Sequence, residues 1–490
     1  MASISVDFGE TVGRLTPRLY GVGFEHLGAS VYGGFWTGEP ADTTAGWRDD
    51  VLQLARRLRP GLLRWPGGNF AQHYRWRDGV GPRENRPSRF DYFWAKPEPN
   101  LVGTDEFLQL CGLIDAEPSI TVNTRTGTPD EAAAWVEYCN GGAETAGGQL
   151  RAANGRRDPY QVRLWAVGSQ SWELGPEDMA RRQAAFAAAM RAVDPTIQLI
   201  AVGSNAANGQ TWDRAMLAGA ADQLDVLGTW AYDGVASVPS GDSRDLHYAN
   251  QAAAERLLWT ASNAAQVVDE RQPERTDAGV GFDSWGIWRT SRQGLQHDYH
   301  LGDALVAGVV LHGLHRLANR ARYAAWGNLV NALGTVQATQ RSAWATPVFH
   351  LLKLFRQHHG DEVVRSSVAG PTFFAPEGHS PVRAPRPAQY DLPLLDASAT
   401  RDRAAGRYAL SVVNRSYDDR EEVDLTLAGL PEGIGATVHT LSDYDAFATN
   451  TLGYPRRVEP YDVPVGQVGS PYSLSPRSVT MFVWEETPGL

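Results

Sequence analysis

The sequence predicts an α/β protein in which a (β/α)8 TIM barrel is followed by a C-terminal antiparallel β-sandwich. Eight short apolar runs end in polar or small residues, and segments of helical period separate most of them. After about residue 365 this alternation gives way to period-two segments. Strands that alternate with helices pair in parallel through right-handed crossovers, so eight such units indicate a closed barrel.

The barrel elements follow in chain order. Strands are predicted at 19–27, 61–69, 118–123, 162–170, 197–205, 224–232, 278–286 and 322–331. Helices are predicted at 49–59, 105–113, 130–140, 176–193, 250–267 and 301–318, and several begin with Asp, Thr or Pro, which favour helix N-termini. A doubly wound sheet is disfavoured because neither a glycine-rich phosphate turn nor a Walker pattern is present.

The C-terminal part of the chain predicts strands of an antiparallel sandwich. Pro-rich turns at 377–393 lead into strands at 408–416, 421–429, 435–443 and 478–486. The opening segment 3–8 indicates one further strand, which we expect to join this sandwich. The predicted domains are therefore the barrel over 15–365 and the sandwich formed by 1–14 with 366–490.

Composition excludes several classes of function. The 490 residues include 45 Lys and Arg against 56 Asp and Glu, a net charge of −11, so we expect no nucleic-acid partner. No apolar run is long enough for a bilayer and no secretory signal precedes the first strand, which predicts a cytoplasmic protein without membrane contact. Cys111 and Cys139 lie in apolar helical segments and are expected to be buried, reduced thiols.

No metal, nucleotide or flavin motif is present, so no cofactor is expected.

Polar and aromatic residues gather where the predicted barrel strands end, the place where barrels of this kind carry their chemistry. These residues are Glu25, His26, Arg64, Trp65, Asn69, Asn123, Ser169, Gln170, Trp172, Glu173, Trp230, Tyr232, Asp283, Ser284, Trp285, Trp326, Asn328 and Asn331. Amides, aromatic rings and few carboxylates favour a pocket for a neutral, polyhydroxylated small ligand such as a sugar.

Several long stretches make the chain similar to one known family. LYGVGFEHLGASVYGGFW (19–36), LLRWPGGNFAQHYRWRDGVGPRENRP (62–87) and FDSWGIW (282–288) resemble the retaining α-L-arabinofuranosidases of glycoside hydrolase family 51. The resemblance implies a barrel with a C-terminal β-sandwich and a homo-oligomeric assembly. It also implies that Glu25, Asn69, Asn123 and Trp285 hold the sugar.

The chain departs from this family at its catalytic positions. Members end strand 4 with Gly-Asn-Glu, whose Glu is the acid/base, whereas this chain has Gln170 at that position. Members end strand 7 with Asp-Glu-Trp, whose Glu is the nucleophile, whereas this chain has Ser284. Trp230 replaces the family's strand 6 histidine and predicts a narrower, more apolar cleft, while Tyr232 beside it is kept. Ser169 stands where the family has Asn, and four linked changes in one pocket favour natural divergence over an inactivating mutation.

Retaining hydrolysis needs two carboxyl groups about 5–5.5 Å apart, so the family mechanism is expected to be lost or nearly lost. The leading hypothesis is a pseudoglycosidase that binds a furanosyl or nucleoside-like sugar and isomerises, eliminates or cyclises it in a biosynthetic pathway. The alternatives are a non-catalytic carbohydrate-binding protein and an α-L-arabinofuranosidase with relocated catalytic residues. The candidate proton carriers are Glu25, Tyr232 and Glu173. The predicted binding residues are Glu25, Asn69, Asn123, Gln170, Trp172, Trp230, Tyr232, Ser284 and Trp285.

Four further side chains have predicted orientations. Asp283 is expected to face the helix layer, because it precedes Ser284 and successive strand residues point to opposite faces. Glu173, in the loop after strand 4, is a candidate to swing into the cleft. His297 and His300 are expected to face solvent in a loop rather than to form a metal pair.

Overall fold

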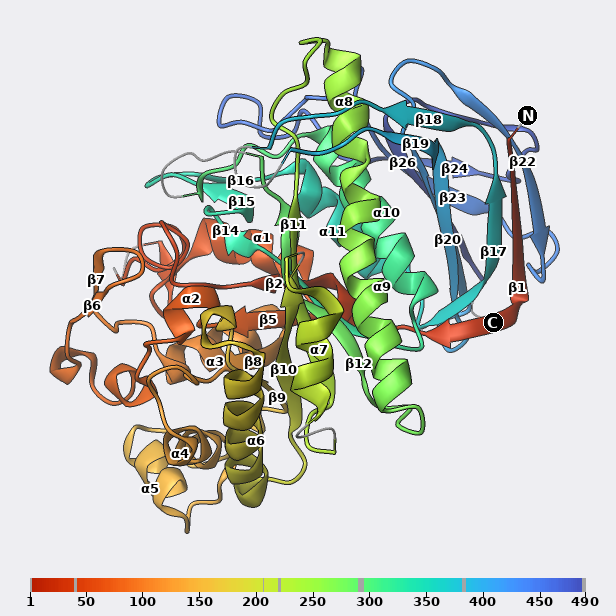
Figure 1. The fold of residues 1–490 in the computed structure, drawn as a ribbon. Helices are drawn as coiled ribbons and strands as arrows, with labels where there is room; N and C mark the ends of the chain where they lie inside the picture. The colour runs from red at the N-terminus through yellow and green to blue at the C-terminus, as the bar shows by residue number, and fades with distance from the viewer. Residues whose placement is uncertain are drawn as a thin grey trace.

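The computed structural model describes residues 2–38, 42–205, 207–218, 222–289, 295–380 and 385–486 of the chain. Eight parallel strands close into a barrel in chain order, which confirms the predicted TIM barrel (Figure 1). They are β2 (Gly21–Gly23), β5 (Leu62–Trp65), β8 (Glu117–Thr121), β9 (Leu164–Val167), β10 (Gln198–Asn205), β11 (Val226–Asp233), β12 (Gly279–Ile287) and β13 (Ala321–Trp326). Each overlaps one of the eight predicted runs, because parallel strands covered on both faces are apolar along their whole length.

Helices follow most of the barrel strands and cover the outside of the barrel (Figure 1). They are α1 (Asp49–Leu58), α2 (Gly68–Ala71), α3 (Thr104–Ile114), α4 (Pro129–Asn140), α5 (Ala146–Ala153), α6 (Pro176–Val193), α7 (Gly209–Ala218), α8 (Ser243–Gln251), α9 (Ala253–Arg271), α10 (Leu301–Arg316) and α11 (Pro347–His358). The side chain of Thr128 caps α4 and that of Thr346 caps α11, and proline fills the first turn of both. The predicted helix 250–267 is divided, because the Asn250 amide bonds to backbone oxygens of Val235 and Leu246 where α8 ends.

Short elements connect these parts. The small strands are β3 (Thr43–Thr44), β4 (Trp47–Arg48), β6 (Arg89–Asp91), β7 (Lys96–Glu98), β14 (Asn328–Val330), β15 (Gly334–Ala338), β16 (Ala343–Ala345), β18 (Thr372–Ala375) and β19 (Gln389–Pro393), and the 3-10 turns are η1 (Pro17–Tyr20), η2 (Trp76–Gly79), η3 (Arg83–Asn85) and η4 (Trp172–Leu174). β6 and β7 pair antiparallel in the long connection between β5 and α3.

The second domain is one sheet with the strand order β24-β23-β26-β21-β20-β17-β1-β22-β25. Its strands are β1 (Ala2–Arg14), β17 (Glu362–Ala369), β20 (Leu395–Asp402), β21 (Arg407–Asn414), β22 (Glu421–Ala428), β23 (Ala436–Ser442), β24 (Tyr461–Val465), β25 (Tyr472–Leu474) and β26 (Ser478–Glu485). Phe8 of β1 contacts Trp484 of β26, with ring centroids 5.9 Å apart, although three strands separate β1 from β26 in the sheet. The sheet therefore curls so that its two halves face each other, and β1 joins it as predicted. It is not wholly antiparallel, because β1 and β22 run parallel.

The barrel and the curled sheet meet across α10, whose residues are buried over almost its whole length. Three buried histidines bond to hydroxyls of the sheet: His312 to Ser411 at 2.7 Å, His315 to Ser398 at 2.8 Å and His359 to Thr400 at 2.9 Å. Each of these three buried imidazole groups therefore has a hydrogen-bond partner at this interface.

Both cysteines, Cys111 and Cys139, are free and buried, as predicted. Within the described ranges, no helix has the length and apolar character needed to cross a membrane. Nor do three or more His, Cys, Asp or Glu side chains of the described chain gather closely enough to hold a metal ion.

Candidate ligand site at the barrel mouth

Five side chains from five different strands meet at the C-terminal end of the barrel, which we call the barrel mouth. Glu25 follows β2, Arg64 lies in β5, Gln170 follows β9, Tyr232 lies in β11 and Ser284 lies in β12. Parallel barrel strands bring their C-terminal ends to one face, so residues far apart in the sequence share this site.

Arg64 is the centre of a buried network in the barrel mouth. Its side chain is fully buried and its Nη1 donates to Glu25 Oε1 at 2.5 Å. Its Nε donates to Asp283 Oδ1 at 2.7 Å and its Nη2 to Ser169 Oγ at 2.9 Å. Burial disfavours the charge, but Asp283 and Glu25 outweigh that effect and raise the pKa of Arg64 above its usual value. Both remaining carboxylates of the barrel mouth are therefore held by one permanent cation.

The prediction that Asp283 faces the helix layer is wrong. In the pairing of β11 with β12, Thr229 lies opposite Phe282 and Trp230 lies opposite Ser284, so Asp283 is an extra, unpaired residue. Such a β-bulge interrupts the alternation of side chains. As a result Asp283 bonds to Arg64 inside the barrel, while Ser284 bonds to Tyr232 at the mouth.

Two glycines of the loop after β5 let Glu25 and Gln170 lie close to α2. A Cβ on Gly67 would stand 2.2 Å from Glu25 Cγ, and Gly67 has a φ of +103°, which L side chains rarely adopt. A Cβ on Gly68 would stand 2.2 Å from Gln170 Nε2 and 3.3 Å from Glu25 Oε2. The amide of Gln170 and the second carboxylate oxygen of Glu25 therefore face the same small space.

The opposite side of the barrel mouth is aromatic. The Tyr232 hydroxyl lies 2.7 Å from Ser284 Oγ, and both side chains are buried. Burial, and then the charge of Glu25, raise the pKa of Tyr232 above its usual value, so the phenol keeps its proton at neutral pH. The Trp230 ring lies 4.7 Å from the Tyr232 ring and 6.0 Å from the Trp172 ring. The buried Nε1 of Trp230 donates to no described residue.

Other predicted site residues make contacts within the protein, and their roles in ligand binding stay predictions. Glu173 lies exposed and forms an ion pair with Arg125. The Asn123 amide donates to Thr126 Oγ1 at 2.9 Å and its oxygen accepts from the Thr126 backbone, which shapes the loop after β8. Asn69 Oδ1 accepts from Gln72 Nε2 at 3.1 Å. Trp285 is fully buried against Trp326, with ring centroids 4.9 Å apart.

His297 and His300 are buried, so the prediction that they face solvent is wrong. His300 is the N-cap residue of α10, and its backbone N–H donates to Asp303 Oδ2 at 2.9 Å. His297 lies with its ring 4.5 Å from the Tyr299 ring and bonds to Arg289 at 3.2 Å. The residues around His300 do not reveal this burial, because the sheet domain, which contributes Phe447 against the His300 ring, is distant in the sequence.

The partnership of Arg64 with Asp283 was not predicted. The signal was present in the sequence, because an arginine between apolar residues of a buried strand (LLRW) must be neutralised by buried carboxylates. The identity of those carboxylates could not be derived, because Asp283 is 219 residues away and lies on a bulge.

Comparison of the sequence with known proteins assigns the chain to a family. Residues 54–235 match the profile of the α-L-arabinofuranosidase 1 domain, and residues 283–478 match that of the α-L-arabinofuranosidase C-terminal domain. An intracellular exo-α-(1→5)-L-arabinofuranosidase of Bifidobacterium longum is 30% identical over 96% of this chain and 89% of its own. The chain belongs to the α-L-arabinofuranosidases of glycoside hydrolase family 51.

Solved structures agree with this family assignment. The α-L-arabinofuranosidase of Thermotoga maritima, solved with arabinose, is 30% identical and has a TM-score of 0.90 over 99% of this chain and 100% of its own. A family 51 α-L-arabinofuranosidase from Thermotoga petrophila is 32% identical, with a TM-score of 0.91 over the same shares. The barrel with its C-terminal sheet domain is thus the family 51 fold.

Proposed function

We propose that the barrel mouth binds an α-L-arabinofuranosyl-like sugar without retaining hydrolysis by paired carboxylates. One observation carries the proposal: at the two positions that the family resemblance assigns to catalytic glutamates, this chain has Gln170 after β9 and Ser284 within β12, an amide and a hydroxyl. The two carboxylates left beside them, Glu25 and Asp283, both bond to Arg64.

The chemistry of these groups supports binding over hydrolysis. A retaining glycosidase needs one carboxylate to attack the anomeric carbon and one carboxylic acid to protonate the leaving oxygen. The amide of Gln170 donates hydrogen bonds but transfers no proton, and general acid–base catalysis is worth about 10²–10⁴-fold. Ser284 lies beside a protonated phenol rather than a base, so its hydroxyl is not activated as a nucleophile.

The same groups suit a sugar that is held and not cleaved. Glu25 Oε2 can accept a hydrogen bond from a sugar hydroxyl. The Gln170 amide and the hydroxyls of Tyr232 and Ser284 can donate hydrogen bonds to sugar oxygens or accept them from sugar hydroxyls. The half-buried ring of Trp230 offers an apolar face of the kind on which sugar rings stack. The family assignment supplies the class of sugar, because the related Thermotoga maritima structure is described as an arabinose complex.

A second candidate function is a slow α-L-arabinofuranosidase with relocated catalytic groups. It is favoured by the relatives, which carry that activity in their names. In this alternative Glu25, whose Oε2 faces the same small space as the Gln170 amide, takes over one catalytic role. Glu173 is less suited, because its side chain is exposed and pairs with Arg125, whereas Glu25 is buried in the barrel mouth.

Isomerisation, elimination or cyclisation receives less support from the site. Such chemistry needs a group that both accepts and returns a proton near neutral pH. Glu25 is bound by Arg64, and burial keeps the Tyr232 phenol protonated. We therefore rank this third.

Two assays on the same preparations test the proposal. Calorimetry with methyl α-L-arabinofuranoside is expected to show saturable binding by the native chain, and 4-nitrophenyl α-L-arabinofuranoside is expected to stay intact. The double variant Gln170→Glu, Ser284→Glu is expected to gain hydrolysis, and Gln149→Glu, on an exposed position of α5, serves as a matched control. Native hydrolysis that Glu25→Gln removes would establish the second candidate instead, and absence of binding would refute the proposal.

We also propose a cellular location and an assembly. The Bifidobacterium longum and Streptomyces lividans relatives are both named intracellular enzymes, which supports a cytoplasmic location for this chain. We further propose a homo-oligomer, as the family resemblance implies. Light scattering of the purified chain tests the assembly, and a monomer at micromolar concentration would exclude it.

A further inference from the structure

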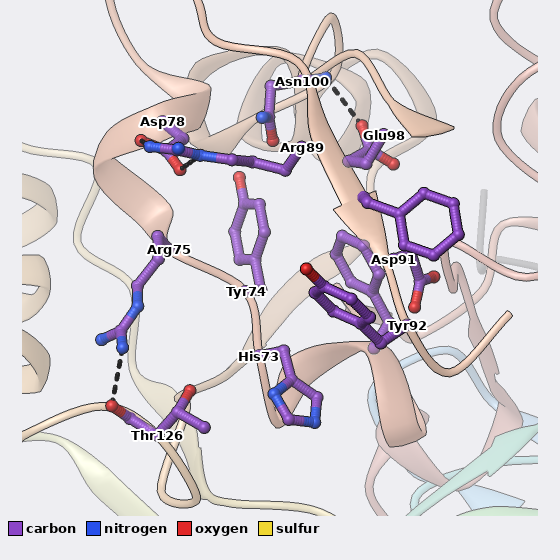
Figure 2. Close-up of a pocket in the computed structure, with 12 residues that line it drawn as sticks. His73, Tyr74, Arg75, Asp78, Arg89, Asp91, Tyr92, Glu98, Asn100 and Thr126 are labelled. Carbon is purple, nitrogen blue, oxygen red and sulfur yellow. Dashed lines mark hydrogen bonds and ion pairs between the residues drawn. The ribbon is translucent and has the colours of Figure 1, made fainter. Parts of the chain in front are cut away.

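A cavity of about 350 Å³ opens beside the barrel mouth, between α2, the β6–β7 hairpin and the loop after β8. Figure 2 shows Tyr74 and Tyr92 on two sides of this cavity, with His73 near its lower end in that view. We call it the hairpin cavity. Phe70, which also lines it, stacks on His26 with ring centroids 4.4 Å apart, and His26 directly follows Glu25 of the barrel mouth. Its volume lies within the range of small-molecule sites, about 300–1,000 Å³.

The hairpin presents aromatic side chains to solvent on a braced turn. Tyr92 is 80% exposed and Phe90 is 52% exposed. Asp91 Oδ1 accepts from the backbone N–H groups of Phe93 and Trp94, at 3.0 and 3.2 Å, which fixes the turn. Large aromatic side chains that a fixed turn keeps exposed to solvent are typical of a surface that binds a ligand.

The charged groups around the hairpin cavity are already neutralised by the protein. Arg89 makes a two-point ion pair with Asp78, at 2.8 and 3.2 Å. Arg75 Nη1 bonds to Glu131 Oε2 at 2.5 Å. Burial, and then Arg125, lower the pKa of His73, so its imidazole is neutral at pH 7. This wall holds no cation free to attract a phosphate, and a neutral ligand suits it better.

One acceptor in the wall is left without a donor. Asp91 is about nine-tenths buried, and its Oδ2 accepts no hydrogen bond from the described residues. A buried carboxylate oxygen without a donor is costly, and a ligand hydroxyl would supply the missing bond. Aromatic faces beside an acceptor for hydroxyl groups are the features that recognise a sugar ring.

We propose that the hairpin cavity is a second sugar-binding site, in which a neutral sugar ring stacks on Tyr92 and donates a hydroxyl to Asp91 Oδ2. Only the choice of sugar rests on the proposed function. The site itself is built from residues that take no part in the barrel mouth. The chain thus holds two sugar units at separate places, joined by the rigid contact of Phe70 with His26.

Equilibrium dialysis with radiolabelled α-(1→5)-L-arabinobiose, the linkage named for the relatives, counts the sites. The native chain is expected to bind two molecules at saturation, and Tyr92→Ala one. Asp91→Asn is also expected to bind one, because asparagine keeps Oδ1 for the turn and replaces the free oxygen with an amide. Tyr444→Ala, at a tyrosine 84% exposed in the sheet domain, is the matched control and is expected to bind two.

Each outcome separates this inference from the proposed function. If the native chain binds one molecule and Tyr92→Ala binds none, the hairpin cavity is a sugar site and the barrel mouth is not. If native chain and both cavity variants bind the same number, the inference is overturned and the barrel mouth stands. If the native chain binds no arabinobiose, both proposals fail.

Discussion

The hydroxyls of Tyr232 and Ser284 lie 2.7 Å apart at the barrel mouth, and both side chains are almost fully buried. The two residues come from neighbouring strands, β11 and β12, and lie 52 positions apart in the sequence. The family resemblance assigns the position of Ser284 to the nucleophile. In this chain the Ser284 hydroxyl is already hydrogen-bonded to Tyr232. Loss of either hydroxyl leaves the other buried without this partner.

A double-mutant cycle is expected to measure this contact. Tyr232→Phe and Ser284→Ala are each expected to lower the free energy of unfolding by about 1–3 kcal/mol, because each leaves one buried hydroxyl unpaired. The double variant is expected to lose less than the sum of the two. Urea unfolding followed by tryptophan fluorescence gives all three values. Strict additivity would show that the two hydroxyls do not interact.

Replacement of Arg64 by methionine is expected to destabilise the barrel strongly. It leaves Glu25 and Asp283 buried without their cation, and removal of one partner from a buried ion pair costs about 3–5 kcal/mol. Arg59→Met is the matched control, because Arg59 pairs with Asp115 at the surface, where such pairs contribute about 0–1 kcal/mol. Thermal unfolding compares the two variants, and equal losses would contradict the central role of Arg64.

The barrel was predictable from the sequence because its strands are buried on both faces and read as separate apolar runs. The orientation of Asp283 was not, because a bulge in β12 breaks the alternation on which that prediction rested. The exposure of His297 and His300 was also misjudged, because the covering surface comes from the distant segment around Phe447. The local sequence pattern thus predicts helices and strands, whereas the burial and orientation of polar side chains depend on partners that are distant in the sequence.

The sequence predicted that Asn123 holds the sugar, and this role stays a prediction. Its position after β8 matches the family resemblance, but its amide oxygen accepts from the backbone of Thr126 and Gly127. The residue type and its position in the sequence do not reveal whether the side chain forms hydrogen bonds with the backbone of its own loop. For Gln170 and Ser284, in contrast, the expected chemistry follows from residue identity alone, and the loss of the paired carboxylates stays a prediction that the hydrolysis assay tests.

Stability is expected to fall as the pH drops below about 6.5, and His247 is one cause. His247 lies buried against Arg415 of the sheet domain, and burial lowers its pKa to about 4. Between pH 6.5 and about 4 the unfolded chain therefore binds a proton that the folded chain does not. The free energy of unfolding consequently decreases with falling pH, by up to about 1.4 kcal/mol per pH unit for this residue.

His247→Gln tests this contribution, because a glutamine amide can still donate to the Arg415 carbonyl. The variant is expected to show a shallower loss of stability between pH 6.5 and 4 in urea titrations. Asp213 and Asp303 act in the opposite direction, since burial raises the pKa of each to about 6. Their protonation in the folded state favours folding as the pH falls from about 6 to 4 and partly offsets the histidines. An unchanged slope in the variant would exclude His247 as a contributor.

Gly68→Ala is expected to affect binding more than folding. The new Cβ would meet Gln170 Nε2 at 2.2 Å, and the end of a flexible side chain can move away at little cost to the fold. The amide of Gln170 would then leave the space that it shares with Glu25. Affinity for methyl α-L-arabinofuranoside is expected to fall about tenfold, with a change in the free energy of unfolding below about 1 kcal/mol.

Gly112→Ala is the matched control for this prediction. A Cβ on Gly112 meets no atom within 4 Å, and alanine in a helix interior is favoured over glycine by about 1 kcal/mol. This variant is therefore expected to be at least as stable as the native chain and to bind the sugar with unchanged affinity. Because Gly112 lies on α3 outside the barrel mouth, a loss of affinity in both variants would show that the effect of Gly68→Ala does not depend on Gln170.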